Sequence, residues 1–167
     1  VFLHHSIDGW PKWERYAEII GGRYHYEPGV LRGVSYPDSG YRFDVEQHID
    51  VIDPTHPICE GLGSGFDIID EPYMFPAFEA DVVPLLRTTF DTSDPKNFYS
   101  PSAAIRGRLH SNENWTHPAG TKLVAWAKHA GNSPIAYVQF GDGPVTYASP
   151  DFRRLLGNAI RWVASPS

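Results

Sequence analysis

The chain has 167 residues, a formal net charge of -6 and 41% hydrophobic residues, which is enough apolar material for one domain with its own core. Because it is acidic and has no basic block, we expect neither nucleic acid nor a membrane surface as a partner. The single cysteine excludes a disulfide framework and a cysteine-based zinc ribbon, but it leaves the cellular compartment open.

The chain opens on an apolar run, residues 1–3, that is typical of a strand buried on both faces. His4, His5 and Ser6 follow at once, before a helix entry at Asp8. Ligands gather at the carboxyl ends of strands in open parallel α/β sheets, so this turn is a candidate site. Because the chain starts inside a strand, we expect an N-terminal segment to be missing. No stretch has the apolar length of a membrane span.

The next elements follow from hydrophobic periodicity. Apolar spacing predicts a helix over residues 11–20, with Asp8 as its cap. Residues 43–52 alternate between apolar and polar side chains, which predicts a half-buried strand near a sheet edge with His48 on its polar face. Shorter strands are predicted at residues 66–69 and 82–90.

The second half of the chain contains a long irregular stretch and then regular elements. Residues 91–121 are rich in Ser, Pro, Asn and Asp, and we interpret them as an excursion that is functional or holds short elements. Strands are predicted at residues 123–127 and 135–140, and residues 145–148 form the return strand of a C-terminal β-hairpin. Asp151 is the predicted cap of an amphipathic terminal helix.

Several stretches, spread in order over nearly the whole chain, resemble the ThuA-like (trehalose utilisation) family. They are Phe2-Leu3-His4-His5, Ser39-Gly40-Tyr41-Arg42, Asp53-Pro54-Thr55-His56-Pro57, Asp70-Glu71 with Tyr73, and Leu156-Gly157-Asn158-Ala159-Ile160-Arg161-Trp162. The resemblance implies an α/β, flavodoxin-like three-layer sandwich with a mostly parallel sheet, related to class I glutamine amidotransferases. It also implies a role in sugar metabolism beside enzymes that handle 3-keto sugars and glycosides.

The chain departs from the family pattern in two places. The family domain normally has a further βαβ portion before the first strand, so we expect one domain over residues 1–167 that is incomplete at its N-terminus. Many members carry a Gly-His pair after the last strand, where this chain has Ala148-Ser149-Pro150. Any role that the family gives to that histidine is therefore not transferred.

The candidate nucleophiles are poor. In the amidotransferase relatives the strand-to-helix elbow holds a cysteine, but here that turn holds His4, His5 and Ser6. The only thiol, Cys59, lies in a turn unlike an elbow and is interpreted as a packing residue, so amidotransferase chemistry is rejected. Ser6 has no G-x-S-x-G pattern around it.

Acid–base chemistry is the better prediction. His4 and His5 would point to opposite faces of a strand, so at most one of them should face the crevice. Glu71 follows a strand and suits a general base for a proton next to a carbonyl. The catalytic candidates are therefore His5, Glu71 and His4. Candidate substrate-binding residues, for which packing roles are nearly as good an interpretation, are Trp10, Tyr41, Tyr73 and Asp70.

A divalent-metal site remains an open alternative, because the chain has eight histidines. No two of them have the H-x-x-x-H or H-E-x-x-H spacing of a local ligand pair. The candidate ligands are His4, His5, His48 and Glu71. No glycine-rich phosphate loop follows a strand, so no nucleotide cofactor is expected. We predict a protein with a small-molecule carbohydrate partner. It is either an enzyme acting on sugars or keto-sugar glycosides by His/Glu acid–base chemistry, or a non-catalytic sugar-binding or accessory domain; homo-oligomerisation is left open.

Overall fold

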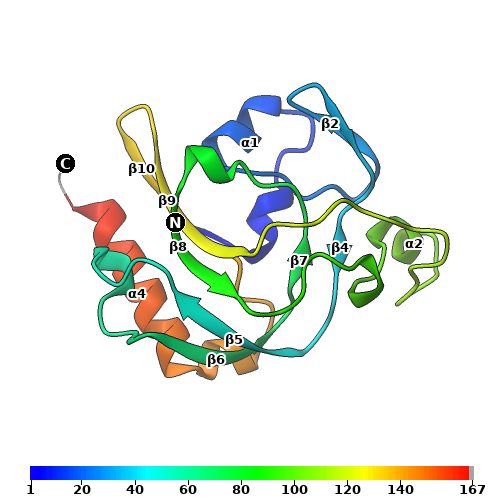
Figure 1. The fold of residues 1–167 in the computed structure, drawn as a ribbon. Coiled ribbons are helices and arrows are strands. Elements are labelled where there is room, and N and C mark those ends of the chain that lie inside the picture. Colours follow the sequence, from blue (N-terminus) through cyan, green and yellow to red (C-terminus); the bar gives the residue numbers. More distant parts are fainter. Residues whose placement is uncertain (166–167) are drawn as a thin grey trace.

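A computed structural model describes residues 1–165 and is built around a six-stranded sheet in the order β1-β10-β9-β8-β5-β6 (Figure 1). The strands are β1 (Phe2–Leu3), β5 (Val45–Val51), β6 (Gly65–Asp70), β8 (Val83–Thr88), β9 (Leu123–Ala130) and β10 (Ser133–Val138). Only β1 and β10 pair in parallel, and the other four pairs are antiparallel. The expected mostly parallel, flavodoxin-like sheet is therefore wrong. Residues 43–140 do not supply the long helical crossovers that neighbouring parallel strands require.

The strand directions still bring several carboxyl ends to one edge. Because the pairs from β10 to β6 alternate in direction, β1, β10, β8 and β6 all run the same way. β1 and β6 lie at opposite ends of the sheet, and a flat sheet would separate them by about 24 Å, five spacings of about 4.8 Å. The side chains of His4 and Glu71, which directly follow these two strands, nevertheless approach to 3.3 Å. The sheet therefore curls into a half-barrel, as Figure 1 shows.

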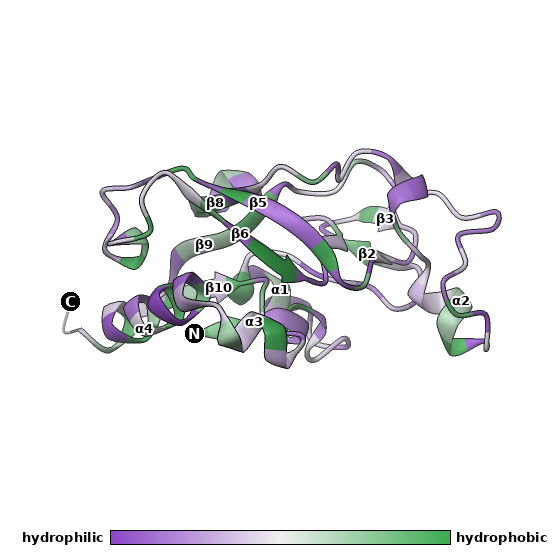
Figure 2. Ribbon diagram, turned by 90° about the horizontal axis from the view of Figure 1, so that it is seen from below, coloured by the Kyte–Doolittle hydropathy of each residue, from purple (hydrophilic) through white to green (hydrophobic). Residues whose placement is uncertain are grey.

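Each face of the sheet has its own core. The terminal helix α4 (Pro150–Ala164) covers one face and buries Phe152 and Leu155 among the strand residues. In Figure 2, α4 lies along one side of the strands and carries both hydrophobic and hydrophilic residues. The helix α1 (Glu14–Ile20) covers the other face, where Trp126 and Tyr137 are fully buried. The Trp126 indole donates a 2.7 Å hydrogen bond to the Ile20 carbonyl, which anchors the end of α1 to the sheet.

Three local predictions need correction. The first helix begins at Glu14 rather than at residue 11, after a turn. The predicted return strand at residues 145–148 is the helix α3 (Pro144–Ala148), because proline suits the first turn of a helix. The C-terminal hairpin is instead formed by β9 and β10, which are joined by a tight turn with Gly131 at φ 60°. The side chain of Ser149, and not that of Asp151, caps α4 by accepting from the Phe152 N–H.

The excursion at residues 91–121 holds short elements, as one of the two interpretations expected. They are the 3₁₀ helix η4 (Pro95–Asn97) and the helix α2 (Pro101–Ile105). A bridge between Tyr99 and Tyr41 fastens this segment to the small ladder of β4 (Gly40–Tyr41) and β7 (Tyr73–Met74). Gly40 permits the close approach, because a Cβ there would lie only 2.8 Å from the Phe98 Cβ. α2 is thereby placed beside the strands that carry Tyr41 and Tyr73.

The remaining elements are short. The strands β2 (Gly29–Leu31) and β3 (Val34–Tyr36) form a separate hairpin. Further 3₁₀ helices are η1 (His4–Asp8), η2 (Pro57–Cys59) and η3 (Glu79–Asp81). Within residues 1–165, no helix combines the length and the hydropathy needed to cross a membrane.

Candidate functional site

Both histidines of the opening turn face the same cluster. They lie on the 3₁₀ helix η1 and not on a strand, and His4 takes a left-handed backbone with φ 43°. The two imidazole rings are 4.3 Å apart, centre to centre. The premise that their side chains point to opposite faces of a strand is therefore wrong, because the alternation of a strand does not apply to a helical turn. Only His5 lines the pocket described below, in line with the expectation that at most one of them faces the crevice.

The Tyr73 hydroxyl is the centre of this cluster. It lies 2.8 Å from His4 Nε2, 2.8 Å from Glu71 Oε2 and 3.3 Å from His5 Nδ1. His4 Nδ1 lies 2.7 Å from the Gln139 carbonyl, which can only accept, so this nitrogen carries a proton and donates it. A phenol has one proton to give, and Tyr73 donates it to Glu71 Oε2, while each of the two imidazole nitrogens donates or accepts according to its tautomer.

The protonation of this cluster follows from its surroundings. Burial lowers the pKa of His4, but hydrogen bonds to Glu71 and to the Gln139 carbonyl, with the charges of Asp70 and Glu71, outweigh burial and raise it. Burial and the Glu71 carboxylate raise the pKa of Tyr73 well above its ordinary value. Tyr73 is therefore a neutral hydroxyl near pH 7, and His4 holds a proton more tightly than a free imidazole does.

Asp70 has a supporting position behind the cluster. Its carboxylate accepts the backbone N–H groups of Gly141 at 2.7 Å, Asp142 at 3.2 Å and Glu71 at 2.8 Å. It does not line the pocket described below. This carboxylate fastens the loop after β10 to the end of β6, and it thereby carries Asp142 to within 3.4 Å of His4 Nε2.

Four side chains of the cluster could hold a divalent cation. One donor atom each from His4, His5, Glu71 and Asp142 can be chosen so that all lie within 4.8 Å of one another. A tetrahedral ion with bonds of about 2.0–2.2 Å holds its ligand atoms about 3.4 Å apart. The 3.3 Å and 3.4 Å separations of His4 Nε2 from the two carboxylates match that value.

His48, the other metal candidate, is not part of this group. The predicted alternation of β5 is confirmed, and His48 lies on its exposed face, where its Nδ1 pairs with Asp67 Oδ1 at 2.6 Å. Asp142 was missed because it lies in a Gly-Asp-Gly turn, which a sequence shows only as a loop.

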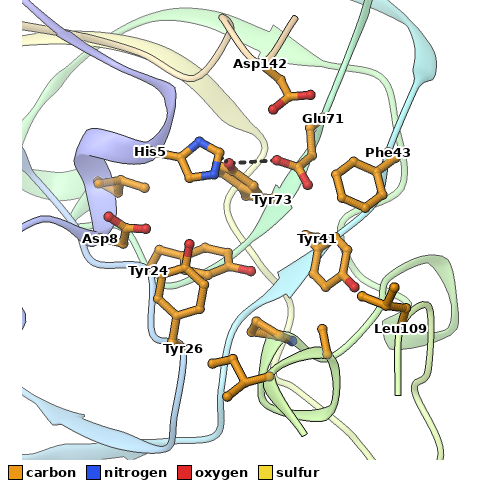
Figure 3. A pocket seen from close by; sticks show the side chains of 14 residues that line it. His5, Asp8, Tyr24, Tyr26, Tyr41, Phe43, Glu71, Tyr73, Leu109 and Asp142 are labelled. Carbon is orange, nitrogen blue, oxygen red and sulfur yellow. Dashed lines mark hydrogen bonds between the residues drawn. The ribbon is translucent and has the colours of Figure 1, made fainter. Parts of the chain in front are cut away.

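A pocket of about 210 Å³ opens over the cluster. Figure 3 shows His5, Glu71 and Asp142 at one end of it, and Tyr26, Tyr41 and Leu109 toward the other. Fourteen residues line the pocket: His5, Ile7, Asp8, Tyr24, Tyr26, Tyr41, Phe43, Glu71, Tyr73, Pro101, Ala104, Ile105, Leu109 and Asp142. His4 is not among them and reaches the pocket only through Tyr73 and Glu71.

The pocket includes two of the four predicted substrate-binding residues and excludes the other two. Tyr41 and Tyr73 line the pocket, whereas Trp10 does not and leaves 71% of its surface exposed. Sequence reasoning missed Asp8, which it used as a helix cap, and Tyr26. The Asp8 and Tyr26 side chains form a hydrogen bond with each other. Burial raises the pKa of Tyr26 to about 12, and the Asp8 carboxylate adds to this increase. The aromatic abundance of the chain was the one signal that pointed to such a lining.

Comparison with known proteins adds the family. Two solved structures of ThuA-like proteins are similar over 99% of this chain. One, from Bacteroides uniformis ATCC 8492, has 20% identity and a TM-score of 0.62; the other, from Parabacteroides merdae ATCC 43184, has 17% identity and a TM-score of 0.57. The chain spans 58% and 61% of their lengths, and at these identities the likeness shows the fold. No curated protein matches the chain.

The family whose description is "Trehalose utilisation" matches residues 1–163, nearly the whole chain. This match agrees with the order of motifs along the sequence and with the two solved structures. The chain belongs to the ThuA (trehalose utilisation) family.

Proposed function

We propose that the chain is an enzyme that moves a proton at a carbon next to the carbonyl of a keto-sugar or keto-glycoside, as an isomerase or epimerase does. One observation carries the proposal: Glu71, Tyr73 and His5 meet at one end of a pocket, joined through the Tyr73 hydroxyl at 2.8 Å and 3.3 Å. The trehalose utilisation family supplies the link to carbohydrates.

The roles follow from which atoms face the pocket. The Glu71 carboxylate accepts the proton from the carbon, and the bond electrons move to form a carbon–carbon double bond. The carbonyl oxygen then gains charge and receives a proton from Tyr73 or His5. Return of a proton to the other face of the same carbon, with the original oxygen giving its proton back to Tyr73 or His5, gives an epimer. Delivery of a proton to the former carbonyl carbon, with the hydroxyl on the first carbon losing its proton to Tyr73 or His5 and becoming the new carbonyl, gives an isomer.

His4 acts as a positioning residue. Its Nδ1–H donates to the Gln139 carbonyl and its Nε2 faces Tyr73, so the ring holds the phenol in place without lining the pocket. Burial lowers the pKa of His4, but its hydrogen bonds to Glu71 and to the Gln139 carbonyl outweigh burial and raise it, so the ring keeps its proton to a higher pH than a free imidazole does.

Covalent chemistry has less support. Ser6 donates its hydroxyl proton to the Leu3 carbonyl at 2.7 Å and does not line the pocket. Cys59 is buried in the core beneath α4, and burial raises the pKa of its thiol to about 11. Neither group has the exposure and activation that a nucleophile needs.

The test is hydrogen exchange at the substrate. The chain is incubated with a keto-glucoside in deuterated water, and NMR follows the proton signal next to the carbonyl. The wild type should exchange this proton, and Glu71→Gln should slow the exchange by about 10²–10⁴-fold while the keto-glucoside still binds. The matched control is Glu46→Gln, which changes an exposed carboxylate on β5 and should exchange like the wild type.

Two other outcomes would contradict the proposal. Exchange that stops when a chelator is added would assign Glu71 to a metal ion, together with His4, His5 and Asp142, and not to the role of base. A chain that binds the keto-glucoside but never exchanges its proton would be a sugar-binding or accessory domain. That second function is the one that the absence of a nucleophile from the opening turn favours.

A further inference from the structure

Large apolar side chains gather where the pocket meets solvent. Leu109 is 68% exposed, Ile105 62%, Phe43 46% and Tyr26 42%, and all four line the pocket. We call these four residues the apolar mouth. Single exposed apolar side chains are ordinary, but several around one cavity mark a binding surface.

Polar contacts outside the pocket join the segments that carry the apolar mouth. The carboxylate of Glu27, next to Tyr26, pairs with Arg106, next to Ile105, at 3.0 Å and also accepts from Ser102 at 3.1 Å. Ser100 caps α2 by accepting the Ala103 N–H at 3.0 Å. An exposed ion pair adds little stability, but here it joins two segments that are far apart in sequence. The two walls of the mouth are therefore positioned before any ligand arrives.

The pocket is polar at one end, which we call its base, and apolar at the other end, the apolar mouth. The base carries His5, Glu71, Tyr73 and Asp142, of which His5 and Asp142 are also exposed to solvent, whereas the four side chains of the apolar mouth bring one polar atom, the Tyr26 hydroxyl. A disaccharide carries hydroxyls along its whole length. The Tyr26 and Tyr41 hydroxyls could pair with some of them at this end of the pocket, but the rest would lose water without gaining a partner.

We propose that the apolar mouth is a subsite for the aglycone of a glycoside, and that this aglycone is aromatic or otherwise apolar. One sugar ring occupies the base, and the aglycone packs between Phe43, Ile105 and Leu109. This inference rests on the proposed function, because it takes the base of the pocket to be the sugar site.

The test compares two ligands that share one sugar, a methyl keto-glucoside and a phenyl keto-glucoside. Their dissociation constants are measured by calorimetry on the full chain. We expect the phenyl ligand to bind at least about tenfold more tightly, because its ring leaves water at the apolar mouth. Leu109→Ser and Ile105→Ser should each remove most of that difference and leave methyl keto-glucoside binding unchanged. The control is Ile160→Ser, at an exposed isoleucine on α4 that does not line the pocket.

The outcomes separate this inference from the proposed function. Equal affinity for both ligands would overturn the aglycone subsite and leave the sugar site standing. Loss of both ligands in Leu109→Ser, in a variant that melts like the wild type, would also overturn the subsite. If neither ligand binds the wild type, the proposed function fails and the subsite fails with it.

Discussion

Replacing Tyr73 by phenylalanine tests whether its hydroxyl joins the cluster. The side chain is 4% exposed, and the change removes only the oxygen that lies 2.8 Å from both His4 Nε2 and Glu71 Oε2. The buried Glu71 oxygen then loses its phenolic donor and keeps His4 Nε2, 3.3 Å away, as its other neighbour; removing one partner from a buried hydrogen-bonded group costs about 1–3 kcal/mol. For a chain of this length, each kcal/mol lowers the melting temperature by roughly 2–4 °C. We therefore expect a fall of about 2–12 °C, measured by circular dichroism near pH 7.

The matched control is Tyr41→Phe. Tyr41 is 6% exposed and lines the same pocket, but within residues 1–165 its hydroxyl has no hydrogen-bond partner. Removing that hydroxyl should change the melting temperature little, or raise it. If Tyr73→Phe melts no lower than Tyr41→Phe, then the Tyr73 hydroxyl does not stabilise the cluster and the proposed proton path loses its centre.

Three further predictions concern charge, and each is measured by urea unfolding. Because the pKa of His4 is raised in the folded chain, its stabilising proton is fully bound below about pH 6.5 and is lost as pH rises through the folded pKa. The difference in unfolding free energy between the wild type and His4→Gln should therefore be larger at about pH 5.5 than at about pH 8.5. An equal gap at both values would contradict this. Burial, followed by the charges of Arg23 and His117, lowers the pKa of His25 to about 4, so stability should fall by up to about 3 kcal/mol from about pH 6.5 to about pH 4. His25→Phe should lessen this fall. If the variant loses as much stability as the wild type between these two pH values, His25 is not the group responsible. Asp70→Asn should cost about 1–3 kcal/mol, because an amide nitrogen cannot accept the Gly141 N–H; a variant as stable as the wild type would show that the loop is held elsewhere.

Local sequence patterns were sufficient to predict much of the secondary structure. The alternation of residues 43–52, the apolar face of the terminal helix and the strand before His4 are each encoded within a few neighbouring residues, and all three occur in the structure. The family resemblance is confirmed, since the motifs that carry it are short and keep their order. The opening histidines and Glu71, which the sequence analysis names together as catalytic candidates, do meet in the structure, although the sheet that brings them together is mostly antiparallel.

Tertiary structure decided which side chains meet. The direction of each strand depends on pairing between segments that are far apart in sequence, so no local pattern could show that most of the sheet is antiparallel or that it curls until its two edge strands approach. The side-by-side placement of His4 and His5 depends on a helical turn that the distant Gln139 carbonyl helps to hold. Asp142 joins the cluster from a loop that Asp70 binds, and Leu109 reaches the pocket from an excursion that is bridged to Tyr41. Sequence alone thus determined the residue types available for chemistry and most of the local elements that carry them, whereas long-range hydrogen bonds and sheet curvature determined the site.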